Sequence, residues 1–182
     1  MTENQEQSNV YSVDLNVETD RYFEPSSIPT DGEPWLVLLM GGPAAGKTTL
    51  RRQKYSTGFV LVDAADIFIS LSRGGYYDFP EAFEEPMDLI GRLVASRAIA
   101  ERRNIVTEVI GSDSGATTEL IEAMRSVGYK IDAVGVTCDV EEAMKGNLSR
   151  GENNISSYFA EPYQRRWLIE AALEAGGKSN RA

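Results

Sequence analysis

Apolar and polar residues follow one another along the chain in a pattern typical of alternating strands and helices. Four short stretches are mainly apolar and are predicted as strands: residues 35–40, 58–63, 104–110 and 131–138. The first of these is apolar throughout, as expected of a strand that is buried on both faces. Strands that alternate with helices indicate a parallel sheet with helices on both of its faces.

The segments between these strands carry apolar residues at helical spacing. A long helix is predicted over residues 81–103, and three more over 116–127, after the N-cap candidate Asp139, and over 162–174. Pro162 suits the first turn of the last helix. We therefore expect an α/β fold, a three-layer sandwich with a mainly parallel sheet.

The first 33 residues differ from the rest of the chain. They contain eight acidic residues and one basic residue, which gives a net charge of −7. Within them, residues 11–18 alternate between apolar and polar, a period of two that predicts a half-buried edge strand. We expect an acidic extension over residues 1–33, a domain over 34–175 and a tail over 176–182.

Composition narrows the chemistry. The net charge is −10, which argues against a nucleic-acid binder or a protein of anionic membrane surfaces. The chain has no histidine, which excludes a Ser-His-Asp unit and a histidine-ligated metal. It has one cysteine, Cys138, which we expect to be buried and inert. No apolar run is long enough to span a membrane, so we expect a cytoplasmic protein.

The sequence GGPAAGKT at residues 41–48 matches the phosphate-binding pattern G-x-x-x-x-G-K-[ST]. It follows an apolar strand and opens a helix near Lys47, which is the context that the pattern requires. Glycines allow the backbone to approach a phosphate, Lys47 reaches the β and γ phosphates, and Thr48 offers a hydroxyl to Mg²⁺. We predict ATP and Mg²⁺ binding by Gly41, Gly42, Pro43, Ala44, Ala45, Gly46, Lys47, Thr48 and Thr49.

The remaining motifs favour a small kinase over other nucleotide-binding classes. The guanine motif N-K-x-D of GTPases is missing from the sequence, and no apolar strand ends in the Asp-Glu pair of motor ATPases. Instead, the second predicted strand ends at Asp63, 15 residues beyond Thr48. This arrangement is typical of small phosphotransferases with an acceptor pocket and a late lid.

Several segments resemble the zeta-toxin-like kinases over about residues 35–170: the loop GGPAAGKTT, the acidic cluster DAAD at 63–66, NIVTEVI at 104–110, GYKIDAVGV and LSR. The resemblance implies an ATP-dependent kinase, with UDP-N-acetylglucosamine as acceptor and a protein antitoxin as partner. The family pattern after the second strand is D-G-D-x-x-R. Here two alanines separate Asp63 from Asp66, and no arginine follows at the expected place.

Asp63 and Asp66 are the candidate catalytic carboxylates. They follow the second strand at its carboxyl end, where ligands bind in open parallel sheets. We predict that Asp66 accepts the proton of the acceptor hydroxyl and that Asp63 holds Mg²⁺ through water. The sequence leaves the two roles interchangeable. The alternative is structural, with Asp66 capping the helix that starts near Ile67.

Glu108 stands in an apolar strand, where an unpaired carboxylate would be costly to bury. We predict that it faces the cleft and binds the acceptor or a metal-bound water. The alternative is an ion pair with Arg102 or Arg103.

Arginines follow the fourth predicted strand, and arginine stabilises the charge of a transferring phosphate. We predict this role for Arg150, at the start of a lid near residues 150–160. At most one of Arg165 and Arg166 faces the site, and we assign Arg165 to the acceptor together with Tyr76. The alternative for each arginine is a solvated surface position.

Two other functions remain open from the sequence. One is a nucleoside, nucleotide or polynucleotide 5′-kinase. The other is a nucleotide-dependent switch that binds ATP, transfers little phosphate and acts through a protein partner.

Overall fold

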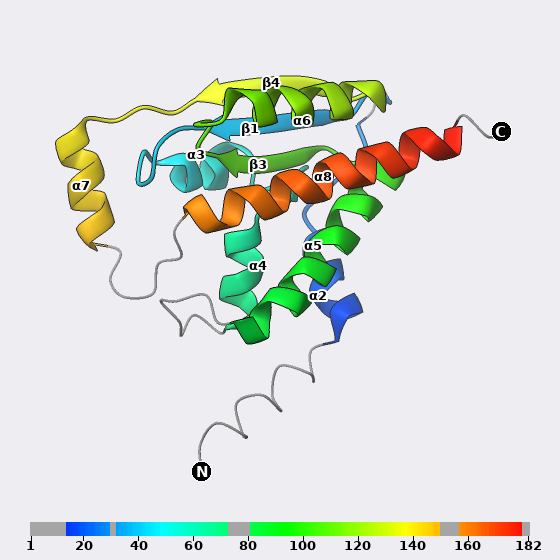
Figure 1. Ribbon diagram of the computed structural model, residues 1–182, viewed down its shortest axis with the longest axis horizontal. Coiled ribbons are helices and arrows are strands. Elements are labelled where there is room, and N and C mark those ends of the chain that lie inside the picture. Colours follow the sequence, from blue (N-terminus) through cyan, green and yellow to red (C-terminus); the bar gives the residue numbers. More distant parts are fainter. Residues whose placement is uncertain (1–13, 30–31, 73–80, 150–156, 180–182) are drawn as a thin grey trace, which may run out of the picture.

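A parallel sheet lies at the centre of the computed structural model, which describes residues 14–29, 32–72, 81–149 and 157–179 (Figure 1). In these residues four strands pair in the order β2-β3-β1-β4. Their bounds are β1 Trp35–Met40, β2 Val60–Leu61, β3 Ile105–Val109 and β4 Lys130–Gly135. Every pairing is parallel, so the predicted α/β fold is confirmed.

The described helices connect and cover these strands. They are α2 Leu15–Arg21, α3 Lys47–Lys54, α4 Ala64–Leu71, α5 Glu81–Ala100, α6 Ser114–Ser126, α7 Val140–Ser149 and α8 Ser157–Ser179. The predicted strand over 35–40 is confirmed at both ends, whereas the predicted strand over 58–63 forms a ladder at two residues only. The long helix ends at Ala100, three residues before its predicted end.

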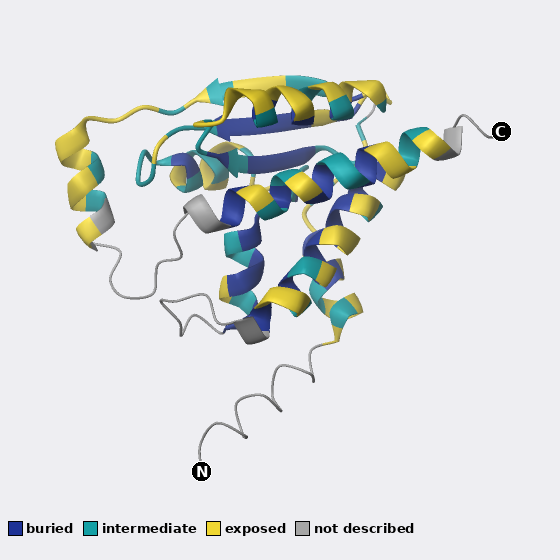
Figure 2. Cartoon of the chain, viewed as in Figure 1, coloured by how far each residue is buried: buried dark blue, intermediate teal, exposed yellow. Residues whose placement is uncertain are grey.

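The two faces of the sheet are covered unequally. One face packs against α3 through a small cluster around Val37, Leu39 and Val106. The other face packs against the main core, to which α4, α5, α6 and α8 contribute. Strands β1 and β3 are buried along most of their length, while β4 at the sheet edge is largely exposed (Figure 2). The layers thus form the predicted three-layer sandwich.

Helices α5 and α8 pack closely because one residue on α5 has no side chain. A Cβ at Gly91 would lie 2.3–2.4 Å from ring atoms of Trp167, which is 1 % exposed. The indole nitrogen of Trp167 donates to Asp88 on α5 at 2.7 Å. Trp167 also lies 6.1 Å from the Tyr163 ring. Trp167 and Tyr163 therefore lie together against α5.

The predicted edge strand over residues 11–18 is wrong where the structure describes it. Residues 15–21 form α2, whose N-cap Asp14 accepts a hydrogen bond from the amide of Asn16 at 2.9 Å. Val17, which a half-buried strand would bury together with Leu15, is 64 % exposed. Residues 11–13 lie outside the described residues.

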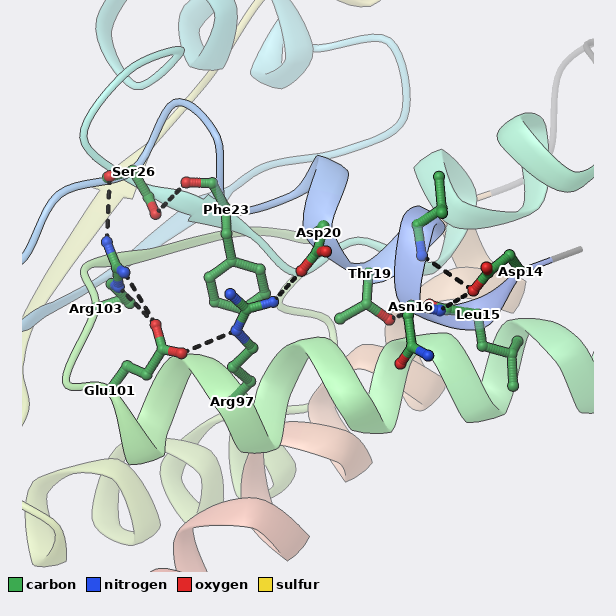
Figure 3. A network of polar contacts seen from close by, with 11 residues as sticks. Asp14, Leu15, Asn16, Thr19, Asp20, Phe23, Ser26, Arg97, Glu101 and Arg103 are labelled. Atoms are coloured by element: carbon green, nitrogen blue, oxygen red, sulfur yellow. Dashed lines mark hydrogen bonds and ion pairs between the residues drawn. The ribbon is translucent and has the colours of Figure 1, made fainter.

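Helix α2 is fixed to the end of α5 by contacts that Figure 3 shows. The Arg97 guanidinium lies 4.1 Å from the centre of the Phe23 ring and also pairs with Asp20. Arg103 donates to the carbonyl oxygen of Ser26 at 3.3 Å, which holds the following turn. The segment before the first strand therefore packs into the core, where Phe23 is 7 % exposed.

The last helix starts earlier than predicted. Helix α8 begins at Ser157, so Pro162 lies inside it and not in its first turn. In this position proline removes one backbone hydrogen bond from the helix interior. The earlier start adds residues 157–161 to the helix, including Glu161, which contacts the site described next.

Candidate functional site

The phosphate-binding loop links β1 to α3 at the carboxyl edge of the sheet. Its backbone takes left-handed conformations at Ala44 (φ 59°) and at Gly46 (φ 96°). Gly41 lies so close to β4 that a Cβ there would approach the carbonyl oxygen of Val136 to 2.3 Å. Glycine is required at such close approaches and favoured at such φ values, so Gly41 and Gly46 serve the loop geometry.

Lys47, the first residue of α3, folds over this loop. Its ammonium group donates to the carbonyl oxygens of Gly41 at 2.6 Å and Gly42 at 2.9 Å. The side chain is 5 % exposed, so it is held within the loop. The positive charge of Lys47 is therefore already placed where the loop would receive phosphates.

The start of α3 has the properties of an anion site. Its N-cap is Gly46, which has no side chain to bind the amides of the first turn. These amides and the helix dipole carry partial positive charge that suits a phosphate. The residues present therefore fit the phosphates of a nucleoside triphosphate, as the sequence predicts.

Thr48 and Glu108 meet between the loop and β3. The Thr48 hydroxyl donates to Glu108 Oε2 at 2.9 Å, and Arg51 Nε donates to Glu108 Oε1 at 2.8 Å. The ion pair is mostly buried, with 13 % and 11 % of the two side chains exposed. The alternative pairing of Glu108 with Arg102 or Arg103 is therefore wrong. A hydroxyl beside a carboxylate is an oxygen donor set of the kind that Mg²⁺ prefers.

Asp63 caps α4, a role that the alternative interpretation gave to Asp66. Its Oδ1 accepts from the amides of Ala65 at 2.8 Å and Asp66 at 3.2 Å. Burial raises the pKa of Asp63 to about 7, and the negative charges of Glu108 and Asp66 act in the same direction. Oδ1 of Asp63 is thus occupied by the cap of α4.

We expect Asp63→Asn to change how stability depends on pH. The folded pKa is about 7 and the ordinary value is 3.8, so the folded state binds the proton more tightly than the unfolded chain. The contribution of Asp63 to stability is thus greatest below about pH 4 and is lost as pH rises to about 7, at roughly 1.4 kcal/mol per pH unit. Asparagine keeps the capping oxygen and does not titrate.

The measurement is chemical denaturation of both proteins from pH 4 to pH 8, without nucleotide or divalent cations. The difference in the free energy of unfolding, variant minus wild type, should become more positive by about 2–4 kcal/mol between pH 4 and pH 8. Parallel pH profiles for the two proteins would contradict the raised pKa.

Asp66 lies one turn along α4 and is more accessible, with 39 % of its side chain exposed. Its Oδ2 accepts from the Tyr22 hydroxyl at 3.2 Å and lies 3.7 Å from Arg21 Nη2. Both partners come from α2 and its C-cap. The sequence did not point to either partner, since 44 residues separate Tyr22 from Asp66.

Helix α8 joins the segments that carry Asp63 and Glu108. Gln164, 1 % exposed, accepts from the amide of Ala64 at 2.9 Å and donates to the carbonyl oxygen of Glu108. Glu161 accepts from the amide of Ile110 at 2.8 Å. Buried polar side chains are kept only where their hydrogen bonds are made, so these contacts define the spacing of α4 and β3. Neither Gln164 nor Glu161 was predicted from the sequence.

The two arginines predicted on the last helix lie in different places. Arg165 lies 3.4 Å from Glu161 and is 19 % exposed, next to the end of β3. Arg166 points elsewhere, to Asp88 on α5 and to the Tyr163 ring. Arg150, Tyr76 and residues 150–156 of the predicted lid lie outside the described residues. Thr49 is exposed on α3.

A cavity of about 550 Å³ lies beside the loop. It is lined by the loop, the ends of β1, β3 and β4, and the start of α7, through side chains that are mostly apolar. Cys138 lines it and is exposed, so the expectation that this cysteine is buried is wrong. The lining residues are Met40, Gly41, Gly42, Pro43, Ala45, Ile110, Gly135, Val136, Thr137, Cys138, Val140, Ala143 and Met144.

Two further properties concern the described residues as a whole. Among them, no three acidic, cysteine or histidine side chains gather into a metal-binding group. Mg²⁺ does not require such a group when a nucleotide is present, because it keeps water and phosphate ligands. In the same part of the chain, every helix is too short or too polar to cross a bilayer.

Comparison with known proteins adds a family and a fold. The family model of the zeta toxins matches residues 19–173. Comparison with curated protein sequences gives no match.

Two solved structures resemble the chain. One comes from the characterization of the PezAT chromosomal toxin-antitoxin system of the human pathogen Streptococcus pneumoniae, with a TM-score of 0.58 and 17 % sequence identity. That match covers 79 % of this chain and 62 % of the other, so this chain spans less than two thirds of the pneumococcal chain. The other comes from the Pnkp1/Rnl/Hen1 RNA repair complex, with a TM-score of 0.48, 22 % identity and coverage of 80 % and 46 %. At 17 % identity, the likeness to the pneumococcal structure concerns the fold alone.

Proposed function

Because the chain belongs to the zeta toxin family, a family of P-loop kinases, we propose that it transfers the γ-phosphate of ATP to a hydroxyl group of a small molecule. The observation that supports the proposal is the hydrogen bond between Thr48 and Glu108, directly beside the loop whose carbonyl oxygens Lys47 contacts. A phosphate loop, a hydroxyl and a carboxylate are the groups that phosphoryl transfer requires around the donor.

The donor would lie with its phosphates on the loop and the start of α3. Lys47 would leave the carbonyl oxygens of Gly41 and Gly42 for the β and γ phosphates. Thr48 and Glu108 would hold Mg²⁺, which when bound neutralises charge on these phosphates. This assignment replaces Asp63 by Glu108 as the acidic residue on the metal side, because Asp63 is engaged as a helix cap.

The cavity beside the loop suits the nucleoside of the donor. Its lining contains no charged side chain, and a nucleoside is uncharged and presents the flat faces of its base to apolar side chains. The cavity lies on the β4 side of the loop, whereas Asp63 and Asp66 follow β2 at the opposite edge of the sheet. Donor and acceptor would thus approach the transferring phosphate from opposite sides, as in-line displacement requires.

Asp66 is the better candidate for the base. It is half-exposed, whereas Asp63 is buried and caps α4. Asp66 would accept the proton of the acceptor hydroxyl while the acceptor oxygen bonds to the γ-phosphorus. The bond from this phosphorus to the bridging oxygen breaks, and ADP leaves with the electron pair. Arg165 and Glu161, next to the end of β3, would face the acceptor.

Membership of the zeta toxin family supports a proposal for the acceptor class. We propose a sugar nucleotide of the UDP-N-acetylglucosamine type, and we propose that a protein antitoxin restrains the activity. Neither proposal rests on the two solved structures, because their low identities bear on the fold alone.

The test is incubation with ATP and Mg²⁺ and a panel of sugar nucleotides, nucleosides and short oligonucleotides, read by mass spectrometry. A phosphate added to UDP-N-acetylglucosamine is the expected result. Phosphate added only to an oligonucleotide would contradict the acceptor class and favour a polynucleotide kinase. ATP binding without transfer to any panel member would contradict the kinase and favour a switch. Lys54→Ala, an exposed lysine at the other end of α3, is the matched control for Lys47→Ala.

A further inference from the structure

Two residues outside the motifs of the sequence, Tyr22 and Arg21, contact the carboxylate of Asp66, and a third, Glu18, pairs with Arg21. The Tyr22 hydroxyl lies 3.2 Å from Asp66 Oδ2, and Arg21 Nη2 lies 2.8 Å from the same hydroxyl. Glu18 Oε2 lies 3.7 Å from Arg21 Nε and accepts from Ser70 of α4 at 3.0 Å. The contacts form a continuous polar chain between α2 and α4.

The direction of the hydrogen bonds in this chain is determined by chemistry. A guanidinium group only donates, so Tyr22 is the acceptor of the bond from Arg21. A tyrosine hydroxyl has one proton, and that proton is then directed to Asp66 Oδ2. Burial and the charge of Asp66 raise the pKa of Tyr22 well above its ordinary value, so the hydroxyl keeps this proton.

These hydrogen bonds make the two carboxylate oxygens of Asp66 inequivalent. Oδ2 receives the Tyr22 hydroxyl and is the oxygen near Arg21. Oδ1 has no hydrogen-bond partner among the described residues. A carboxylate with one oxygen held and the other free is an oriented base, comparable to a base that a third group holds in place.

The support behind Tyr22 is rigid. Its ring is 5 % exposed and belongs to the main core, while its neighbour Phe23 is held by Arg97 of α5 (Figure 3). The hydroxyl therefore has a fixed position relative to α4, independent of Asp66 itself. A donor held by the core can restrict the rotation of a side chain that is otherwise 39 % exposed.

We propose that Tyr22 is a positioning residue for Asp66: its hydroxyl, oriented by Arg21, holds Oδ2 and leaves Oδ1 as the oxygen that takes the acceptor proton. This inference rests on the proposed function, in which Asp66 is the base. It gives the segment before the first strand a part in the site that the sequence analysis did not foresee.

The experiment compares Tyr22→Phe with Tyr129→Phe. Tyr129 is a matched control, because its hydroxyl is also buried and contacts the carbonyl oxygens of Ala98 and Arg103, away from Asp66. Release of ADP is measured for each variant with UDP-N-acetylglucosamine as acceptor and, separately, with water as acceptor. Thermal unfolding is measured in parallel.

Tyr22→Phe should lower kcat roughly tenfold and leave the KM for ATP unchanged, because one hydrogen bond to a charged group is lost. Arg21→Gln should lower kcat less, in the same direction. Tyr129→Phe should lower the unfolding temperature without changing kcat. In the Asp66→Asn background, Tyr22→Phe should have no further effect, because no base remains to be oriented.

Three results would overturn the proposal. One is a kcat for Tyr22→Phe equal to that of the wild type while Asp66→Asn is inactive. Another is an equal fall in kcat for Tyr129→Phe, which would indicate general destabilisation. The third is a tenfold effect of Tyr22→Phe that persists without Asp66. Wild-type activity of Asp66→Asn would instead refute the assignment of the base in the proposed function, and the role of Tyr22 with it.

Discussion

Lys47→Ala is expected to lower kcat/KM for phosphate transfer by roughly 10²–10³-fold. The ammonium group of Lys47 is held in the loop, where charge on the β and γ phosphates increases during transfer. Removal of this charge leaves the loop amides and the α3 dipole as the remaining source of positive potential. Initial rates with increasing ATP, together with titration calorimetry, measure the loss of turnover and of affinity separately.

The control distinguishes charge from packing. Lys47→Met keeps most of the aliphatic volume and should lose as much activity as Lys47→Ala, whereas Lys54→Ala should behave as the wild type. Because Lys47 donates to two loop carbonyl oxygens, its loss also relaxes the loop, and thermal unfolding will report that change. Near-normal transfer by Lys47→Met would contradict the role of the charge.

Asp66→Asn is expected to lower kcat by roughly 10²–10⁴-fold, the usual contribution of a general base. The affinity for ATP should stay unchanged, since Asp66 lies on α4 and the predicted donor site lies on the loop and α3. Asparagine has nearly the same shape and can still accept from Tyr22, so the fold should be retained. Single-turnover kinetics with the identified acceptor measure the chemical step directly.

Asp63→Asn provides the comparison that identifies the base. In the structure Asp63 caps α4, and asparagine is an equally good cap, so turnover should fall by less than about tenfold. The reverse pattern, with Asp63→Asn inactive and Asp66→Asn active, would make Asp63 the base. The sequence leaves this choice open, because both residues follow the same strand three positions apart.

Local patterns predicted the parts of the site that are contiguous in the chain. The loop at 41–48 and the strand before it were recognised from short-range composition, since the turn needs glycine and a buried parallel strand needs an apolar run. The strand order, with β1 between β3 and β4, was not predicted and is known from the structure alone. Glu108 was recognised as unusual because a carboxylate in an apolar strand needs a partner.

Helix α2 shows why a short pattern can mislead. Residues 15–21 begin within an alternating segment, yet Leu15, Thr19 and Tyr22 also lie three and four positions apart and are the residues that turn inward. Over so few residues the two periods cannot be separated. Asp14 is the residue that indicates a helix start, because it caps α2. It also occupies a polar position of the alternating pattern, so it was not recognised as a cap.

The hydrogen bonds by which Gln164 connects α4 to β3 were not predictable from the sequence. A glutamine in a helix usually lies at the surface, and its partners on α4 and β3 are 100 and 56 residues away. Its role depends on a long-range arrangement that only the folded chain shows. The same holds for Tyr22, whose buried ring and hydroxyl contact are invisible to any local pattern.

The late position of Glu161 and Gln164 in the sequence has a consequence for synthesis of the protein. Glu161 and Gln164 belong to α8, the last helix among the described residues, so a ribosome must complete more than 160 residues before α4 and β3 can be held at their final spacing. A nascent or prematurely released chain would contain the whole phosphate loop without this support. The proposed kinase activity would therefore be confined to chains translated through α8, because shorter chains lack the residues that hold α4 and β3 together.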